Sequence, residues 1–247
     1  MFIIINTILI VNRYFMFYVY MITNYYFQPV DSLYTDWYTK FYKEYWRCVV
    51  EELQELDNRE KILECALNLF YQKGYDAVGV QEIVTLAGIT KPTMYYYFKS
   101  KYGLLEALLH ERCSKMNEQL REAAFYNGDL VFTLERYAKT MFAIAESDLR
   151  FYYLTLSLFY SARENETYKA IIPYMKEQFA IIRGIFEQAA GYLGNMNGRQ
   201  EQFAVGFSGI LNNYILVYFE REDTTGQLED DKTIYSLVHQ FMHGIVV

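Results

Sequence analysis

From residue 57 onward, apolar residues recur at the three- and four-residue spacing that places them on one face of an α-helix. The first such segment starts at Asp57, whose side chain can cap the first turn, and ends before Gly74. Its apolar face consists of Ile62, Ala66, Leu69 and Phe70. The pattern therefore predicts a helix that begins at residue 58 and ends at about residue 73.

Two shorter helices are predicted next, over 80–87 and 91–98, with Gly88 ending the first and Thr90 capping the second. Pro92 then falls at the second helical position, where the backbone N–H is unpaired in any case, so proline costs little there. The residues expected to face the core on the second short helix are Met94, Tyr97 and Phe98. Those expected to face outward are Lys91, Thr93, Tyr95 and Tyr96.

A helix, a short turn containing glycine and a second short helix together indicate a helix-turn-helix, whose second helix enters the DNA major groove with its N-terminus first. The charge distribution agrees with this interpretation. Residues 57–110 hold six basic and six acidic side chains, whereas 1–56 hold four against six and 111–247 hold thirteen against eighteen, which gives the net charge of −7. Acidic surfaces repel nucleic acid, so we expect any DNA contact to lie within the neutral segment.

Over residues 58 to about 110 the sequence resembles the DNA-binding region of TetR-family (TetR/AcrR-type) transcriptional regulators. The pattern A-x-x-L-F-x-x-x-G-Y is present as Ala66, Leu69, Phe70, Gly74 and Tyr75. The pattern I-x-x-x-A-G-[IV]-[ST] is present as Ile83, Ala87, Gly88, Ile89 and Thr90. The third block is Thr93, Met94, Tyr95, Tyr96, Tyr97, Phe98, Ser100 and Lys101. The sequence departs from the family at Gly79, where a capping hydroxyl is usual, and at Val84, where alanine is usual.

The resemblance implies that Thr93 and Tyr95 contact phosphate, that Tyr96 reaches base edges or phosphate, and that Lys101 anchors on phosphate. The complete set of DNA contacts expected is Gln81, Thr85, Thr90, Lys91, Pro92, Thr93, Tyr95, Tyr96, Lys99 and Lys101. An ordinary surface role remains the alternative for each of these side chains. A solvated helix cap is the alternative for Lys101.

The remaining chain is predicted to be helical throughout, so the fold class expected is all-α. The helices expected are 102–124, 129–146, 148–159, 165–193 with an interruption near Pro173, 198–221 and 231–244. The family resemblance implies that residues 111–247 form a helical ligand-binding and dimerisation domain.

A cavity for an unknown small-molecule effector is expected inside this domain, although the same residues would look alike if they filled a core. The candidates are Phe132, Tyr137, Met141, Phe142, Tyr152, Leu156, Phe159, Tyr174 and Phe186. A homodimer contact is expected on the last two helices. Its candidates are Phe207, Leu211, Tyr214, Tyr218, Leu237 and Phe241.

Residues 1–56 are expected to form an N-terminal extension before the domain at 57–110. Its apolar run at 2–22 is long enough to span a bilayer, but Arg13 lies in its middle. A start codon placed too early, a membrane anchor and a packing helix are all open readings of this run, and a membrane partner is not favoured. Residues 37–55 are predicted to form an amphipathic helix.

Other chemistry finds little support in the sequence. The three cysteines fit no zinc, redox or disulfide pattern, which favours a cytoplasmic protein. His239 and His243 have metal-ligand spacing but no third ligand, and no catalytic constellation stands out, so we expect neither metal, cofactor nor enzyme activity. The leading hypothesis is a ligand-responsive homodimeric repressor that binds a palindromic operator. The alternative is a membrane-tethered or protein-partnered helical adaptor with secondary DNA binding.

Overall fold

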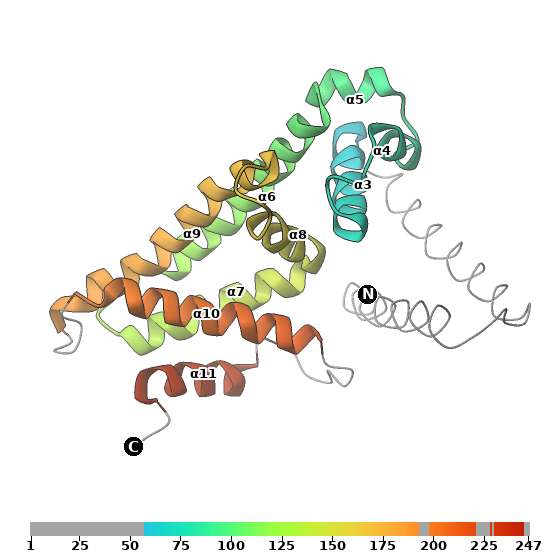
Figure 1. The fold of residues 1–247 in the computed structure, drawn as a ribbon. Coiled ribbons are helices and arrows are strands. Elements are labelled where there is room, and N and C mark those ends of the chain that lie inside the picture. The colour runs from blue at the N-terminus through green and yellow to red at the C-terminus, as the bar shows by residue number, and fades with distance from the viewer. Residues whose placement is uncertain (1–56, 193–197, 221–227, 229, 245–247) are drawn as a thin grey trace, which may run out of the picture. The chain divides into compact units, whose positions relative to one another are not determined.

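The residues that the computed structural model describes are 57–192, 198–220, 228 and 230–244. This part of the chain contains helices and no strand, which confirms the all-α prediction (Figure 1). None of its helices combines the length and the apolarity that crossing a membrane requires. The extension at 1–56, with the apolar run 2–22 and the helix expected at 37–55, lies outside the described residues.

Three short helices form the N-terminal unit of the described chain. They are α3 (Asn58–Lys73), α4 (Val80–Leu86) and α5 (Lys91–Phe98). Asp57 caps α3 by accepting the Glu60 N–H at 2.9 Å, and Gly74 ends it with φ of 81°. Side chains buried completely or almost so fill the space between the helices, among them Ile62, Leu67, Phe70, Ile83 and Met94. The helix bounds therefore agree with the sequence pattern to within one residue.

The remaining helices, which we call the helical domain, belong to the same compact unit as the first three. They are α6 (Lys101–Ala123), α7 (Leu130–Ser147), α8 (Leu149–Phe159), α9 (Glu166–Ala189), the 3-10 turn η1 (Ala190–Tyr192), α10 (Gln200–Phe219) and α11 (Asp231–His243). The predicted interruption of α9 near Pro173 is wrong, because the helix continues through the proline. It packs along α6 (Figure 1), and the Asn117 side-chain amide donates to the Tyr174 carbonyl at 3.2 Å. These contacts support the helix where proline removes one backbone hydrogen bond.

Aromatic side chains dominate the core of the helical domain. Phe186 lies 6.0 Å from both Phe203 and Phe241, measured between ring centroids, and Phe207 lies 4.9 Å from Phe241. Phe207 and Leu211 are completely buried within the single chain. This corrects the expectation that these two side chains contact a second chain: they belong to the protein's own core. The other residues predicted for dimerisation are half-buried.

Two of the three cysteines, Cys65 and Cys113, are completely buried. Burial raises the pKa of each thiol to about 12. Because the thiolate is the reactive form, we expect neither cysteine to react with Ellman's reagent in the native protein at pH 8. Both should react once guanidinium chloride unfolds the chain. Labelling of Cys65 or Cys113 in the native protein, located by mass spectrometry, would contradict this burial.

Candidate nucleic-acid interface

The turn between α4 and α5 has the geometry of a helix-turn-helix. Gly88 adopts φ of 65°, and the Ile89 N–H donates to the Val84 carbonyl at 3.0 Å, which closes the turn. Thr90 caps α5: its hydroxyl accepts the Thr93 N–H at 3.4 Å and lies 2.9 Å from the Thr93 hydroxyl. This cap fixes where α5 begins and leaves its N-terminal end at the surface, because residues 90–92 are exposed.

Most side chains predicted to contact DNA lie at the surface. Tyr96 is 81% exposed and Tyr95 is 44% exposed. The other exposed members of the set are Gln81, Thr85, Thr90, Lys91, Pro92 and Lys99. Gln81 donates to the Thr85 hydroxyl at 3.2 Å, so these two neighbours on α4 present one polar surface. Thr93 is half-buried beside the cap.

The prediction that Tyr97 belongs to the core is wrong. Its side chain is 39% exposed and lies against Tyr96, edge to face, with ring centroids 5.2 Å apart. Met94 and Phe98 are four residues apart and therefore lie directly above one another on the inner face of this short helix. Tyr97 falls at the margin of that face. The surface of α5 thus carries three consecutive exposed tyrosines.

Lys101 differs most from its expected role. Its amine donates to the carbonyl oxygens of Tyr75 at 3.0 Å and Val78 at 3.1 Å, and lies 4.1 Å from the centre of the Tyr75 ring. A lysine ammonium has three N–H donors, so two are used inside the protein. The first residue of α6 therefore fastens the loop between α3 and α4, and a phosphate could share only the remaining donor.

We expect the substitution Lys101→Met to lower the free energy of unfolding by about 1–2 kcal/mol, because two carbonyls lose a charged donor and the Tyr75 ring loses its cation. Urea denaturation followed by circular dichroism measures this. Lys99→Met is the matched control, since Lys99 is exposed and should change stability by less than about 0.5 kcal/mol. Equal urea midpoints for the two variants would show that Lys101 has no fastening role.

The junction between α5 and α6 holds a feature that the sequence analysis missed. Ser100 caps α6 by accepting the Gly103 N–H at 2.8 Å. A Cβ atom added to Gly103 would lie 2.2 Å from the carbonyl oxygen of Phe98, the last residue of α5. A glycine inside a helix costs about 1 kcal/mol of stability relative to alanine. A glycine in the first turn of a predicted helix could therefore have indicated that another part of the backbone lies close to this position. Gly103 lets the backbones of the two helices approach this closely.

The cap of α4 confirms one departure from the family pattern. Gly79 occupies the N-cap position, and no side chain caps the helix there. The hydroxyl that TetR-family members usually place at this point is therefore absent. One phosphate contact expected from the resemblance has no side chain to make it.

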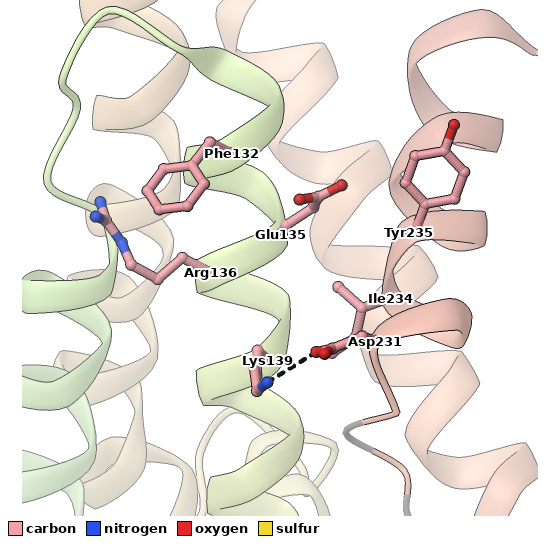
Figure 2. A pocket seen from close by; sticks show the side chains of 7 residues that line it. All are labelled: Phe132, Glu135, Arg136, Lys139, Asp231, Ile234 and Tyr235. Atoms are coloured by element: carbon pink, nitrogen blue, oxygen red, sulfur yellow. Dashed lines mark hydrogen bonds and ion pairs between the residues drawn. The ribbon is translucent and has the colours of Figure 1, made fainter.

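A groove lies apart from this surface, between α7 and α11, with a volume of about 460 Å³ (Figure 2). The residues that line it are Phe132, Glu135, Arg136, Lys139, Asp231, Ile234 and Tyr235. Lys139 and Asp231 join the two helices by an ion pair of 2.8 Å. Of the residues predicted to line an effector cavity, Phe132 borders this groove and the others do not. Five of those others are buried, namely Tyr137, Met141, Phe142, Tyr152 and Phe186, and Leu156, Phe159 and Tyr174 are half-buried.

Comparison with known proteins agrees with the helix-turn-helix geometry. Residues 62–108 match the family model of bacterial regulatory proteins, tetR family. The chain is 34% identical over 104 residues to the HTH-type transcriptional regulator QacR of Staphylococcus aureus, a match that covers 38% of this chain and 55% of QacR. Matches to four curated regulators of 31% to 37% identity span between 34% and 55% of those proteins.

Solved structures show that the likeness in fold extends over most of the described chain. The TetR-family regulator PfmR of Thermus thermophilus aligns with a TM-score of 0.61 and 20% identity, covering 75% of this chain and 99% of PfmR. The regulator FadR of Bacillus subtilis, solved in complex with stearoyl-CoA, aligns with a TM-score of 0.61 and 20% identity, covering 76% and 99%. Residues 62–108 thus form a helix-turn-helix of the type found in the tetR family of bacterial regulatory proteins, and the rest of the described chain shares the fold of solved TetR-family regulators.

Proposed function

We propose that this protein is a sequence-specific transcriptional regulator that binds DNA as a homodimer through α5. The observation that carries the proposal is the exposed surface of α5, where Tyr95, Tyr96 and Tyr97 stand beside the uncovered N-terminal end of the helix. That end carries partial positive charge and suits phosphate, while exposed phenol groups can donate to phosphates or base edges. Lys91 and Lys99 flank this surface and add positive charge.

A homodimer would use the outer faces of α10 and α11. Val205 and Val217 on α10 are 56% and 52% exposed, and Tyr235 on α11 is 58% exposed. Asn213, also on α10, is exposed as well. These residues replace Phe207 and Leu211 as the proposed contacts. Half-buried Tyr214, Tyr218, Leu237 and Phe241 border them.

Selection of bound duplexes from a random DNA library with the purified full-length protein tests this function. Two recognition helices of a symmetric dimer should recover a palindrome whose half-sites lie about 34–36 Å apart, one helical turn. The protein should bind this duplex at least roughly 1,000-fold more tightly than random DNA. Recovery of no sequence, with equal affinity for all duplexes, would overturn the proposal. Sedimentation of the protein with the recovered duplex gives its stoichiometry.

We further propose that a small molecule binds the helical domain and changes the DNA affinity. The buried aromatic residues of α7, α8 and α9 favour an apolar effector, and FadR, a regulator of similar fold, was solved with stearoyl-CoA. The hydroxyl of Tyr152 donates to the Asn212 side chain at 2.7 Å, and this pair supplies a polar contact for orientation inside the domain. Regulation of this kind would place the protein in the cytoplasm with its DNA.

A direct probe of the effector proposal is stearoyl-CoA, together with shorter acyl-CoA thioesters and free stearate. A ligand that favours one conformation should change the affinity for the selected duplex by about 5–150-fold. Fluorescence anisotropy of the labelled duplex measures the change. An unchanged anisotropy curve with every acyl compound would exclude an acyl effector and leave the DNA-binding proposal intact.

A further inference from the structure

Helix α3 carries two polar side chains, Glu64 and Asn68, that contact helices of the helical domain. Glu64 accepts hydrogen bonds from Arg112 of α6 and, at 3.3 Å, from Arg150 of α8. Asn68, one turn further along α3, accepts a hydrogen bond from the same Arg150. Asn68 is 3% exposed. One guanidinium of the helical domain therefore holds two successive turns of α3.

Asp148 completes this cluster from the corner between α7 and α8. It pairs with Arg112, lies 3.8 Å from Arg150, and caps α8 by accepting the Phe151 N–H at 3.1 Å. Five charged side chains meet here, Glu60, Glu64, Arg112, Asp148 and Arg150, with 18% to 38% of each exposed and a net charge of −1. Partial burial weakens screening, so removal of one member leaves its partners with charges that water cannot fully solvate.

A second tie holds the chain just after α3. The hydroxyl of Tyr75 donates at 2.7 Å to Glu166, the first residue of α9. Tyr75 is 5% exposed, and its ring lies beneath the Lys101 amine. Burial and the hydrogen bond to Glu166 both raise the pKa of this phenol, so it remains a donor across the physiological range. Helix α8 therefore binds the middle of α3, and α9 binds Tyr75, just beyond the C-terminal end of α3.

We propose that these two ties act as a clamp that sets the orientation of the DNA-reading helices on the helical domain. The clamp residues are Glu64, Asn68, Tyr75, Arg112, Asp148, Arg150 and Glu166. The inference rests on the proposed function, because a dimer that reads two half-sites must hold its two reading units at a fixed separation. The clamp residues lie on elements other than α5 and the outer face of α4, so they are positioning residues for recognition. A loosened clamp should relax the choice of half-site spacing.

The test compares Arg150→Gln and Tyr75→Phe, separately and combined, with the wild-type protein. Arg121→Gln is the matched control, because Arg121 pairs with Glu177 and joins α6 to α9 without touching α3. Each protein is titrated with the duplex selected by the wild type and with the same duplex carrying one or two inserted base pairs between half-sites. Circular dichroism first confirms that every variant retains its helix content.

The wild type and the control should strongly prefer the selected spacing. The doubly substituted protein should lose about tenfold of that preference, a change within the usual range of coupling between sites. Its affinity for random duplex should not change, because that binding depends on surface charge. Arg150→Lys should recover part of the preference, since it restores the charge without the planar fork. An unchanged spacing preference in the double variant would overturn the clamp.

A second measurement does not depend on DNA. Spin labels on Asp76→Cys and Lys176→Cys, both exposed positions, report the distance between the reading unit and α9. The labelled chain carries Cys48→Ser and is diluted with unlabelled protein, and buried Cys65 and Cys113 stay unlabelled. A broader distance distribution in the double variant supports the clamp, whereas an unchanged width overturns it. The two proposals can fail separately. If the distance distribution broadens in the double variant but the wild-type protein selects no DNA sequence, the proposed function is overturned and the clamp is supported.

Discussion

Substitution of Gly103 by alanine should destabilise the protein by about 3 kcal/mol and lower its affinity for its selected DNA site at least roughly tenfold. The added Cβ would lie 2.2 Å from the Phe98 carbonyl oxygen, which is backbone and cannot rotate away. Either α6 or the end of α5 must move. Because α5 is the proposed recognition helix, the movement should affect DNA binding as well as stability. Urea denaturation and fluorescence anisotropy measure the two effects.

Gly184 supplies a control with the opposite sign. It lies inside α9, and a Cβ added there meets nothing within 4 Å. Gly184→Ala should therefore gain up to about 1 kcal/mol of stability from helix propensity alone. It should leave DNA binding unchanged. If Gly103→Ala stabilises the protein as Gly184→Ala does, the close approach of α5 and α6 is not a constraint.

Substitution of Tyr96 by alanine should weaken binding to the selected duplex by up to about 3 kcal/mol, or roughly 100-fold. The side chain is 81% exposed on α5 and contacts mainly the neighbouring Tyr97 ring, so its removal should cost little stability. The loss should be larger for the selected duplex than for random DNA, because contacts to base edges carry the sequence preference. Anisotropy titrations with both duplexes give the ratio.

Tyr160 is the matched control for this experiment. It ends α8 in the helical domain and is 79% exposed, almost the same as Tyr96. Tyr160→Ala should bind both duplexes as the wild type does. Equal losses for Tyr96→Ala on selected and random DNA would assign Tyr96 to the phosphate backbone. No loss on either duplex would remove it from the interface.

The sequence predicted the helices between residues 57 and 98 well. The helices at 58–73 and 91–98 begin and end where capping residues and glycines indicated, since these signals act through neighbouring backbone groups. Pro92 sits in the first turn of α5 as expected. Proline was misleading at Pro173, where packing against α6 outweighs the local preference of the residue. Local rules work best where few distant contacts compete with them.

Side-chain roles were harder to predict. Exposure of Tyr95 and Tyr96 followed from helical spacing, but Tyr97 lies one position from the inner face and was assigned to the wrong side. Lys101 matches a phosphate-binding motif, yet carbonyls 23 and 26 residues earlier occupy its amine. Phe207 and Leu211 have the spacing of an interface and are core residues of the single chain. Spacing alone cannot show which of two apolar surfaces will cover a helix face.

By itself, the sequence determined that this chain is helical, that residues near 57–110 contain a helix-turn-helix, and which end of that motif carries exposed tyrosine and lysine side chains. Those features depend on capping, spacing and charge within short segments. Only the tertiary structure decided which groups occupy the Lys101 amine, how closely α5 and α6 approach at Gly103, and that α3 is held by Arg150 and Glu166. These depend on residues up to 91 positions apart, brought together only when the helices pack.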